Sequence, residues 1–211
     1  MLDEIPTDFE ADADAALTTA LTSSRLMLLG ETHGVQENPA IIYTLFRRFH
    51  FSALALEWPP GLNLRSPTVS ADGRVTLGHF ELLGQLQRDG LLAHVILFDS
   101  AGDGTWTGRD RAMATRLLEG LRQGLTTLVV AGNLHTATHH LPYGHPMGEY
   151  VAAQVPNVPT GRIRYLGGQY YNFGIKKFRR RLWHRRQRAR FYLKEGEFIF
   201  ELPLAHAIAV D

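Results

Sequence analysis

The 211-residue chain contains no cysteine. Disulfides, thiolate zinc sites, iron–sulfur clusters and cysteine nucleophiles are therefore excluded, and any metal must be held by nitrogen and oxygen ligands. The chain also lacks the Gly-x-Ser-x-Gly sequence of a serine nucleophile elbow and the glycine-rich Lys-Ser/Thr sequence of a phosphate-binding loop. These absences direct attention to histidine and carboxylate side chains.

Long apolar runs are missing as well, since none approaches the ~18 residues that span a bilayer. The segment Met1–Ala20 is acidic, whereas a signal peptide is basic and then apolar. We therefore expect a cytoplasmic protein without a transmembrane segment. Lysine is scarce, with 3 residues against 19 arginines, a ratio associated with bacterial genomes rich in G and C.

The order of apolar and amphipathic segments predicts the fold class. Short apolar runs alternate with helical patterns over the first two thirds of the chain, which is typical of parallel α/β units. We expect an α/β fold with a central, mostly parallel sheet flanked by helices and antiparallel strands added at the C-terminal end. Composition and length fit a single domain, 1–211, with a parallel core at about 24–140 and a basic, antiparallel addition at about 150–211.

Individual elements follow from the same patterns. The expected parallel strands are 26–29, 53–56, 94–98 and 127–131, the expected helices are 12–22, 39–49, 77–86 and 107–122, and the expected antiparallel strands are 162–171, 190–194 and 198–202. Asn38 is expected to cap the second helix, and Thr107 with Asp110 has the spacing of a capping box at the fourth.

Charge is segregated along the chain. The segment Tyr150–Lys194 has no acidic residue and carries +12, whereas the rest, with ten cations and all 21 acidic residues, carries −11. The densest part, Lys176–Arg190, would suit an anionic partner such as nucleic acid or a membrane surface. We favour the alternative that this stretch packs against the acidic remainder of the chain.

Polar residues follow all four expected parallel strands, at the edge where ligands bind in open parallel sheets. They are Gly30-Glu31-Thr32-His33-Gly34 after the first strand, Glu57 after the second, Asp99 after the third, and Gly132-Asn133-Leu134-His135 after the fourth. In extended backbone, residues two apart share a face, so Glu31 would lie beside His33 and Asn133 beside His135. Two histidines and two glutamates at one edge indicate a functional crevice.

These motifs resemble the superfamily that groups erythromycin esterase-like proteins, ChaN-like haem-binding lipoproteins and the Tiki metalloproteases. The resemblance covers about residues 26–139 and also includes Arg109-Asp110-Arg111-Ala112-Met113-Ala114 at a helix start. It implies an α/β fold with a site built from the two Gly-x-x-His ends and a strand-end glutamate. Members of the superfamily look like ester hydrolases that activate water, metal-dependent proteases or haem binders.

We expect Glu31, His33, Glu57 and His135 to form the reacting shell of a hydrolase. Its substrate would be an ester, lactone or amide in a small molecule or peptide, attacked by activated water. If a metal is present, the same four residues would bind zinc or manganese, which lowers the pKa of bound water to roughly 7. Without a metal, one histidine or glutamate is the base and the other imidazole polarises the carbonyl; the sequence leaves both open.

Other residues have weaker assignments. Arg109, Asn133 and Asp99 are candidates for binding substrate, although capping explains the region of Arg109 and a turn explains Asn133 equally well. His139 is a possible extra metal ligand.

The alternative function is a binding protein of ChaN-like type without turnover. It would bind haem or another anionic small ligand through the histidine-rich segment and Tyr170 or Tyr171. As a cofactor, we rank haem behind a divalent metal.

Overall fold

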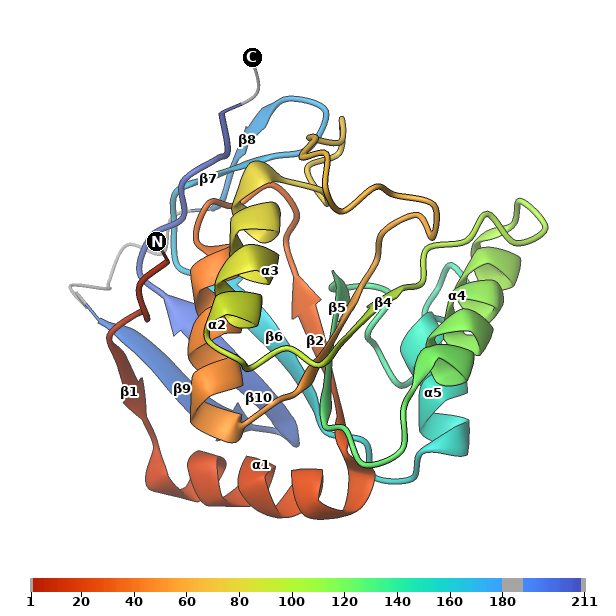
Figure 1. The fold of residues 1–211 in the computed structure, drawn as a ribbon, viewed down its shortest axis with the longest axis horizontal. Helices are drawn as coiled ribbons and strands as arrows, with labels where there is room; N and C mark the ends of the chain where they lie inside the picture. Colours follow the sequence, from red (N-terminus) through yellow and green to blue (C-terminus); the bar gives the residue numbers. More distant parts are fainter. Residues whose placement is uncertain (1, 180–187, 210–211) are drawn as a thin grey trace.

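The computed structural model describes residues 2–179 and 188–209, which are built around a mixed sheet (Figure 1). Its strands are β1 (Thr7–Phe9), β2 (Leu26–Glu31), β3 (Ala53–Leu56), β4 (His94–Leu97), β5 (Thr127–Gly132), β6 (Thr160–Tyr165), β9 (Ala189–Lys194) and β10 (Glu197–Leu202). Their order is β1-β9-β10-β6-β2-β5-β3-β4, and every neighbouring pair is parallel except β9 and β10. A separate antiparallel pair consists of β7 (Gln169–Tyr171) and β8 (Ile175–Lys177).

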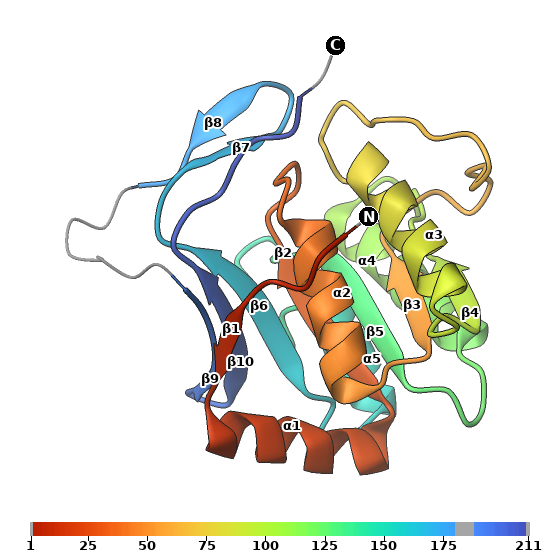
Figure 2. The same ribbon diagram turned by 60° about the vertical axis from the view of Figure 1, so that its left-hand side comes forward.

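Helices cover both faces of the sheet (Figure 2). They are α1 (Ala11–Ser24), α2 (Asn38–Phe49), α3 (Leu77–Arg88), α4 (Trp106–Gly120) and α5 (Met147–Gln154). The first three share a core with one face, and α4 and α5 share a core with the other. In α2, Ile41, Leu45 and Phe46 are fully buried, and each such side chain contributes about 1.5–3 kcal/mol. Among the described residues, no helix combines the length and apolar character needed to cross a bilayer.

The expected α/β fold is confirmed, but the expected direction of one strand is wrong. The sequence 162–171 divides into β6 and β7, and β6 pairs parallel with both β2 and β10. In β6, Ile163 is buried and Arg162 is exposed, since part of the face opposite α1–α3 has no helix over it. This alternation occurs in any half-covered strand, so it does not determine strand direction. The pattern also missed β1, β8 and α5.

Both predicted helix caps are wrong. The N-cap of α2 is Glu37, and the Asn38 amide instead donates to the Thr32 carbonyl (2.9 Å) and accepts from the Tyr165 hydroxyl. The N-cap of α4 is Thr105, whose hydroxyl accepts from the Gly108 N–H at 3.0 Å. Moving the helix start to Trp106 releases Asp110 from any capping role.

The basic C-terminal stretch is described only in part. Lys176 and Lys177 are exposed in β8, and residues 180–187 of the predicted basic stretch lie outside the described residues. At its end, Arg188 pairs with Asp8 at 3.3 Å and Arg190 pairs with Glu10. These two contacts agree with packing of the basic stretch against the acidic N-terminal region.

Candidate functional site

The strand register brings the polar strand ends together. Glu31 lies opposite Gly132 in the pairing of β2 with β5, and Leu56 at the end of β3 lies opposite both Val130 of β5 and Leu97 of β4. Glu57 therefore continues directly beside the end of β5. Four adjacent strands thus place their following residues along one edge of the sheet, as the sequence predicted.

The end of β2 forms the first histidine–carboxylate pair. The Nδ1 of His33 is 3.0 Å from Oε1 of Glu31, whose side chain is buried. An ionised carboxylate only accepts hydrogen bonds, so Nδ1–H donates, and Nε2 has the lone pair when the ring is neutral. That Nε2 has no hydrogen bond among the described residues, and Oε2 of Glu57 lies 3.8 Å from it. A Cβ at Gly132 would lie 3.1 Å from this nitrogen, so glycine there leaves room for the imidazole.

A second pair forms between the turn after β5 and α4. The Nδ1 of His135 is 2.7 and 3.0 Å from the two carboxylate oxygens of Asp110, which is fully buried and also accepts from the Met147 N–H at 2.9 Å. The Nε2 of His135 faces Nη1 of Arg109 at 3.1 Å. Since a guanidinium can only donate, Nε2 is the acceptor in the neutral ring, and Nδ1 then carries the proton that Asp110 accepts. The indole of Trp106 stacks on the ring at 4.5 Å between centroids.

Glu57 lies between the two histidines. Its Oε2 accepts from the Gly132 N–H at 2.9 Å, and its Oε1 lies 3.7 Å from Nε2 of His135. The same Oε1 accepts from Arg74 at 3.1 Å and from Arg109 at 2.9 Å. The carboxylate is buried, and these donors compensate for its lost hydration.

Both arginines also bind Asp99. Arg74 Nη1 donates to one oxygen of Asp99 at 2.9 Å, and Arg109 Nη2 donates to the other at 2.7 Å. Asp72 holds Arg74 from the opposite side through Nε at 2.5 Å. The guanidinium groups are about a quarter exposed, so they line the accessible side of the site.

The charges in this cluster shift the pKa values of its members. Burial alone would raise the pKa of Glu57, but His135, His33 and Arg74 outweigh it and lower the pKa to about 2. Burial would likewise raise the pKa of Glu31. The imidazoles of His33 and of His79 in α3, whose Nε2 lies 3.8 Å from Oε2 of Glu31, outweigh this effect and lower the pKa. Burial also lowers the pKa of His33, yet its bond to Glu31 and the charge of Glu57 raise it overall.

Two predicted residues lie outside the cluster. The expectation that Asn133 shares a face with His135 is wrong, because the backbone turns after Gly132, where the His135 N–H bonds the Gly132 carbonyl at 2.9 Å. Asn133 and His139 instead line a cavity of about 720 Å³ over β6 and β10. The Asn133 amide lies 3.4 Å from the Thr32 hydroxyl.

Sequence reasoning missed that Arg74 contacts Glu57 and that Asp110 and Trp106 contact His135. Arg74 lies in the irregular connection between β3 and α3, where no periodic pattern indicates a direction. Asp110 was assigned to capping, and no local pattern indicated its contact with His135, since neighbouring helical residues do not share a face.

The residues at this edge do not fit the zinc or manganese ion that the sequence left open as one alternative. Arginine donors occupy Oε1 of Glu57 and Nε2 of His135, and a backbone N–H occupies Oε2 of Glu57. Oε2 of Glu31 has no hydrogen bond among the described residues and lies 3.8 Å from Nε2 of His79, but its carboxylate is bound at the Nδ1 side of His33, away from Nε2 of that ring. The available lone pairs therefore do not converge on one point, and two guanidinium groups repel a cation.

Comparisons with known proteins support the fold. No family model matches the chain, and no curated protein matches it significantly. A solved succinoglycan biosynthesis protein superposes with a TM-score of 0.60 at 9% identity, covering 91% of each chain. A mutant erythromycin esterase, EreC, in its open conformation gives 0.57 at 12% identity, covering 78% of each chain. The chain therefore has an erythromycin esterase-like fold, and the resemblance to ChaN-like and Tiki proteins stays a prediction.

Proposed function

We propose that the protein is a hydrolase that cleaves an ester, lactone or amide bond with a histidine-activated water and without a metal. The observation that carries this proposal is the Nε2 of His33, which has no hydrogen bond among the described residues; Glu31 accepts from Nδ1–H, so Nε2 is the accepting nitrogen when the ring is neutral. The erythromycin esterase-like fold supports the same reaction class.

His33 is the general base in this proposal. A water bound between its Nε2 and Oε2 of Glu57, which are 3.8 Å apart, can donate one proton to each. The water oxygen attacks the carbonyl carbon while Nε2 takes its proton. The resulting imidazolium is stabilised by Glu31 and Glu57, and it returns the proton to the leaving oxygen or nitrogen as the scissile bond breaks.

Arg109 stabilises the negative charge that develops on the carbonyl oxygen. Its guanidinium is held by Glu57 and Asp99, and its Nη1 is directed at Nε2 of His135. An oxyanion that replaces Nε2 of His135 as the acceptor of Nη1 receives a charged hydrogen bond from Arg109. His135 is a positioning residue in this scheme, because Asp110 fixes its tautomer and thereby the position of Arg109.

The test is an assay of the purified protein on a panel of p-nitrophenyl esters, lactones and anilides, with His33→Ala beside His139→Ala as the matched control. We expect turnover in the wild type and in the control, undiminished after treatment with EDTA, and loss of turnover in His33→Ala. Equal turnover in the two variants contradicts the proposal. No turnover on any substrate, with a Soret band on haem titration that disappears in His135→Ala, favours the binding alternative.

A further inference from the structure

A tight turn after the candidate site brings two exposed histidines together. Leu141 and Gly144 form an isolated antiparallel bridge, with N–H to carbonyl bonds of 3.1 and 3.0 Å in the two directions. The flanking residues, His140 and His145, therefore leave the turn side by side. The His145 N–H also lies 3.3 Å from the Thr107 hydroxyl, which anchors the turn to α4.

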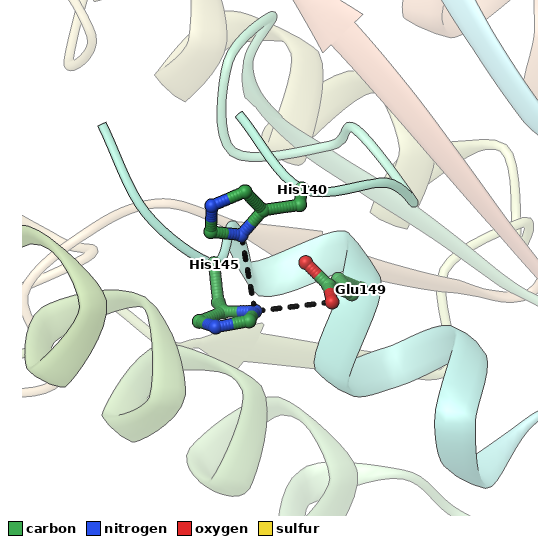
Figure 3. Close-up of side chains that lie close together, drawn as sticks. All are labelled: His140, His145 and Glu149. Atoms are coloured by element: carbon green, nitrogen blue, oxygen red, sulfur yellow. Dashed lines mark hydrogen bonds and ion pairs between the residues drawn. The ribbon is translucent and has the colours of Figure 1, made fainter. Parts of the chain in front are cut away.

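A carboxylate from the next helix completes the group (Figure 3). Glu149 lies in the first turn of α5, and its Oε1 is 3.0 Å from Nδ1 of His145. The Nδ1 of His140 lies 3.4 Å from the same nitrogen. Among residues 2–179 and 188–209, this is the group of three ligating side chains whose donor atoms all lie within 4.8 Å of one another.

These distances match the spacing of ligands around one ion. Two ligand atoms at about 2.0–2.1 Å from a tetrahedral metal are about 3.3 Å apart. The observed 3.4 and 3.0 Å separations are close to that value. A small movement of the exposed side chains would bring all three atoms to bonding distance.

Hydrogen bonds alone satisfy the group poorly. One ring nitrogen carries either a proton or a lone pair, so Nδ1 of His145 cannot donate to Glu149 and also accept from His140. If it donates to Glu149, a single proton is shared between two acceptors. The second oxygen of Glu149 is buried and has no hydrogen-bond partner among the described residues. A cation would satisfy all three donor atoms.

The two histidine-containing sites differ in their cationic neighbours. At the strand ends, arginines already occupy the lone pairs. Within the described part of the chain, Glu149 forms its ion pair with His145. Two imidazoles with one carboxylate suit zinc and similar transition metals, whereas Mg²⁺ and Ca²⁺ prefer oxygen ligands. The His145 side chain is 49% exposed, which leaves a coordination position open to water.

We propose that His140, His145 and Glu149 form a zinc-type site that fixes the turn beside the candidate active site. Tyr143 within this turn packs on Trp106 at 6.2 Å between ring centroids, and Trp106 stacks on His135. The ion has no part in the hydrolytic step proposed above, so the two proposals stand or fail separately.

The test is titration of the untagged, chelator-treated protein with ZnCl₂ by isothermal calorimetry. We expect one zinc per chain in the wild type, in His139→Ala and in His33→Ala. The double variant His140→Ala/His145→Ala should lose this binding, and Glu149→Gln should weaken it by at least about tenfold, the loss that even indirect partners of metal ligands cause. All three replaced side chains are at least partly exposed, so we expect the variants to fold. Unfolding curves measured in EDTA check this.

Thermal unfolding gives a second readout. Zinc should raise the melting temperature of the wild type and of His33→Ala but leave the double variant unchanged, because only the native turn binds the ion. MgCl₂ should have no effect. Unchanged zinc affinity in the double variant overturns this proposal, as does binding that is lost in His33→Ala and kept in the double variant.

Discussion

The two histidine–carboxylate pairs at the sheet edge have the same chemistry but different surroundings. In the pair at the end of β2, Nε2 of His33 has no hydrogen bond, and the nearest carboxylate oxygen of Glu57 is 3.8 Å away. In the pair between the β5 turn and α4, Nε2 of His135 accepts from Arg109 at 3.1 Å. One imidazole is therefore available to take a proton, and the other holds a guanidinium.

The backbone explains this difference. The motif Gly-x-x-His occurs after both strands, but Gly30 lies within β2 opposite Ala131, whereas Gly132 is the last residue of β5. The chain remains extended through Glu31, which places the carboxylate beside its own histidine. After Gly132 the chain turns, so His135 finds its carboxylate on another helix. Similar sequences thus leave Nε2 of the histidine without a hydrogen bond at one strand end and bonded to an arginine at the other.

The largest predicted effect is loss of the base. His33→Ala should lower kcat/KM by about 10³-fold, within the range that general bases contribute. His135→Ala should lower it less, because Arg109 keeps its bonds to Glu57 and Asp99. Steady-state kinetics on the best substrate of the panel checks the order of the two variants. A larger loss in His135→Ala would reverse the roles assigned to the pairs.

The next effect concerns the tautomer of His135. Asp110→Asn lets the amide donate to Nδ1, which moves the ring proton to Nε2, where it faces the donor Nη1 of Arg109. We expect a loss of about 10²-fold in kcat, smaller than the roughly 10⁴-fold loss for the equivalent change beside a histidine base. The matched change beside His33, Glu31→Gln, should cost more. Equal losses of kcat in Asp110→Asn and Glu31→Gln would show that the two histidine–carboxylate pairs have the same role.

Glu57, which separates the pairs, should make the protein sensitive to acid. Its pKa is about 2 in the folded protein against an ordinary 4.5, so its contribution to stability is complete above pH 4.5 and is lost as the pH falls toward 2. The shift corresponds to about 3 kcal/mol. Urea unfolding at pH 7 should show a lower free energy of unfolding for Glu57→Gln than for the wild type, and the difference between the two should be smaller at pH 3. The exposed Glu119→Gln serves as control, and a gap independent of pH would contradict this prediction.

The smallest effect is a shift of the pH profile. Since Glu31 and Glu57 raise the pKa of His33 above its ordinary 6.5 despite burial, activity should rise with pH through a midpoint above 6.5 as the imidazolium loses its proton. Glu31→Gln removes one of these carboxylates and should move that midpoint to lower pH. Log(kcat/KM) against pH measures both. A wild-type midpoint below 6.5 would exclude His33 as the titrating base.

The sequence predicted the parallel core and much of the candidate site because both depend on local patterns. Apolar runs identified β2 to β5, and the common edge of parallel strands then placed Glu31, His33, Glu57 and His135 near one another. The Glu31–His33 contact followed from the two-residue period of extended backbone. These features need no knowledge of how distant segments pack.

The remaining features depend on tertiary structure. Arg74 reaches the site from an irregular connection, and Asp110, which is 25 residues away from His135 in sequence, reaches it from α4. The position of Asn133 depends on a turn that glycine permits but does not require. Strand direction in β6 is set by its neighbours β2 and β10, which lie far from it in sequence.

The most direct test of the account is the tautomer of the two histidines and the titration of His33, measured by long-range ¹H–¹⁵N NMR on the labelled protein, with His33→Ala and His135→Ala for assignment. In the neutral form of each ring we predict a proton on Nδ1 and a bare Nε2, and we predict a pKa above 6.5 for His33. A proton on Nε2 of His33 in the neutral ring would contradict the account, because no lone pair would then face the water beside Glu57.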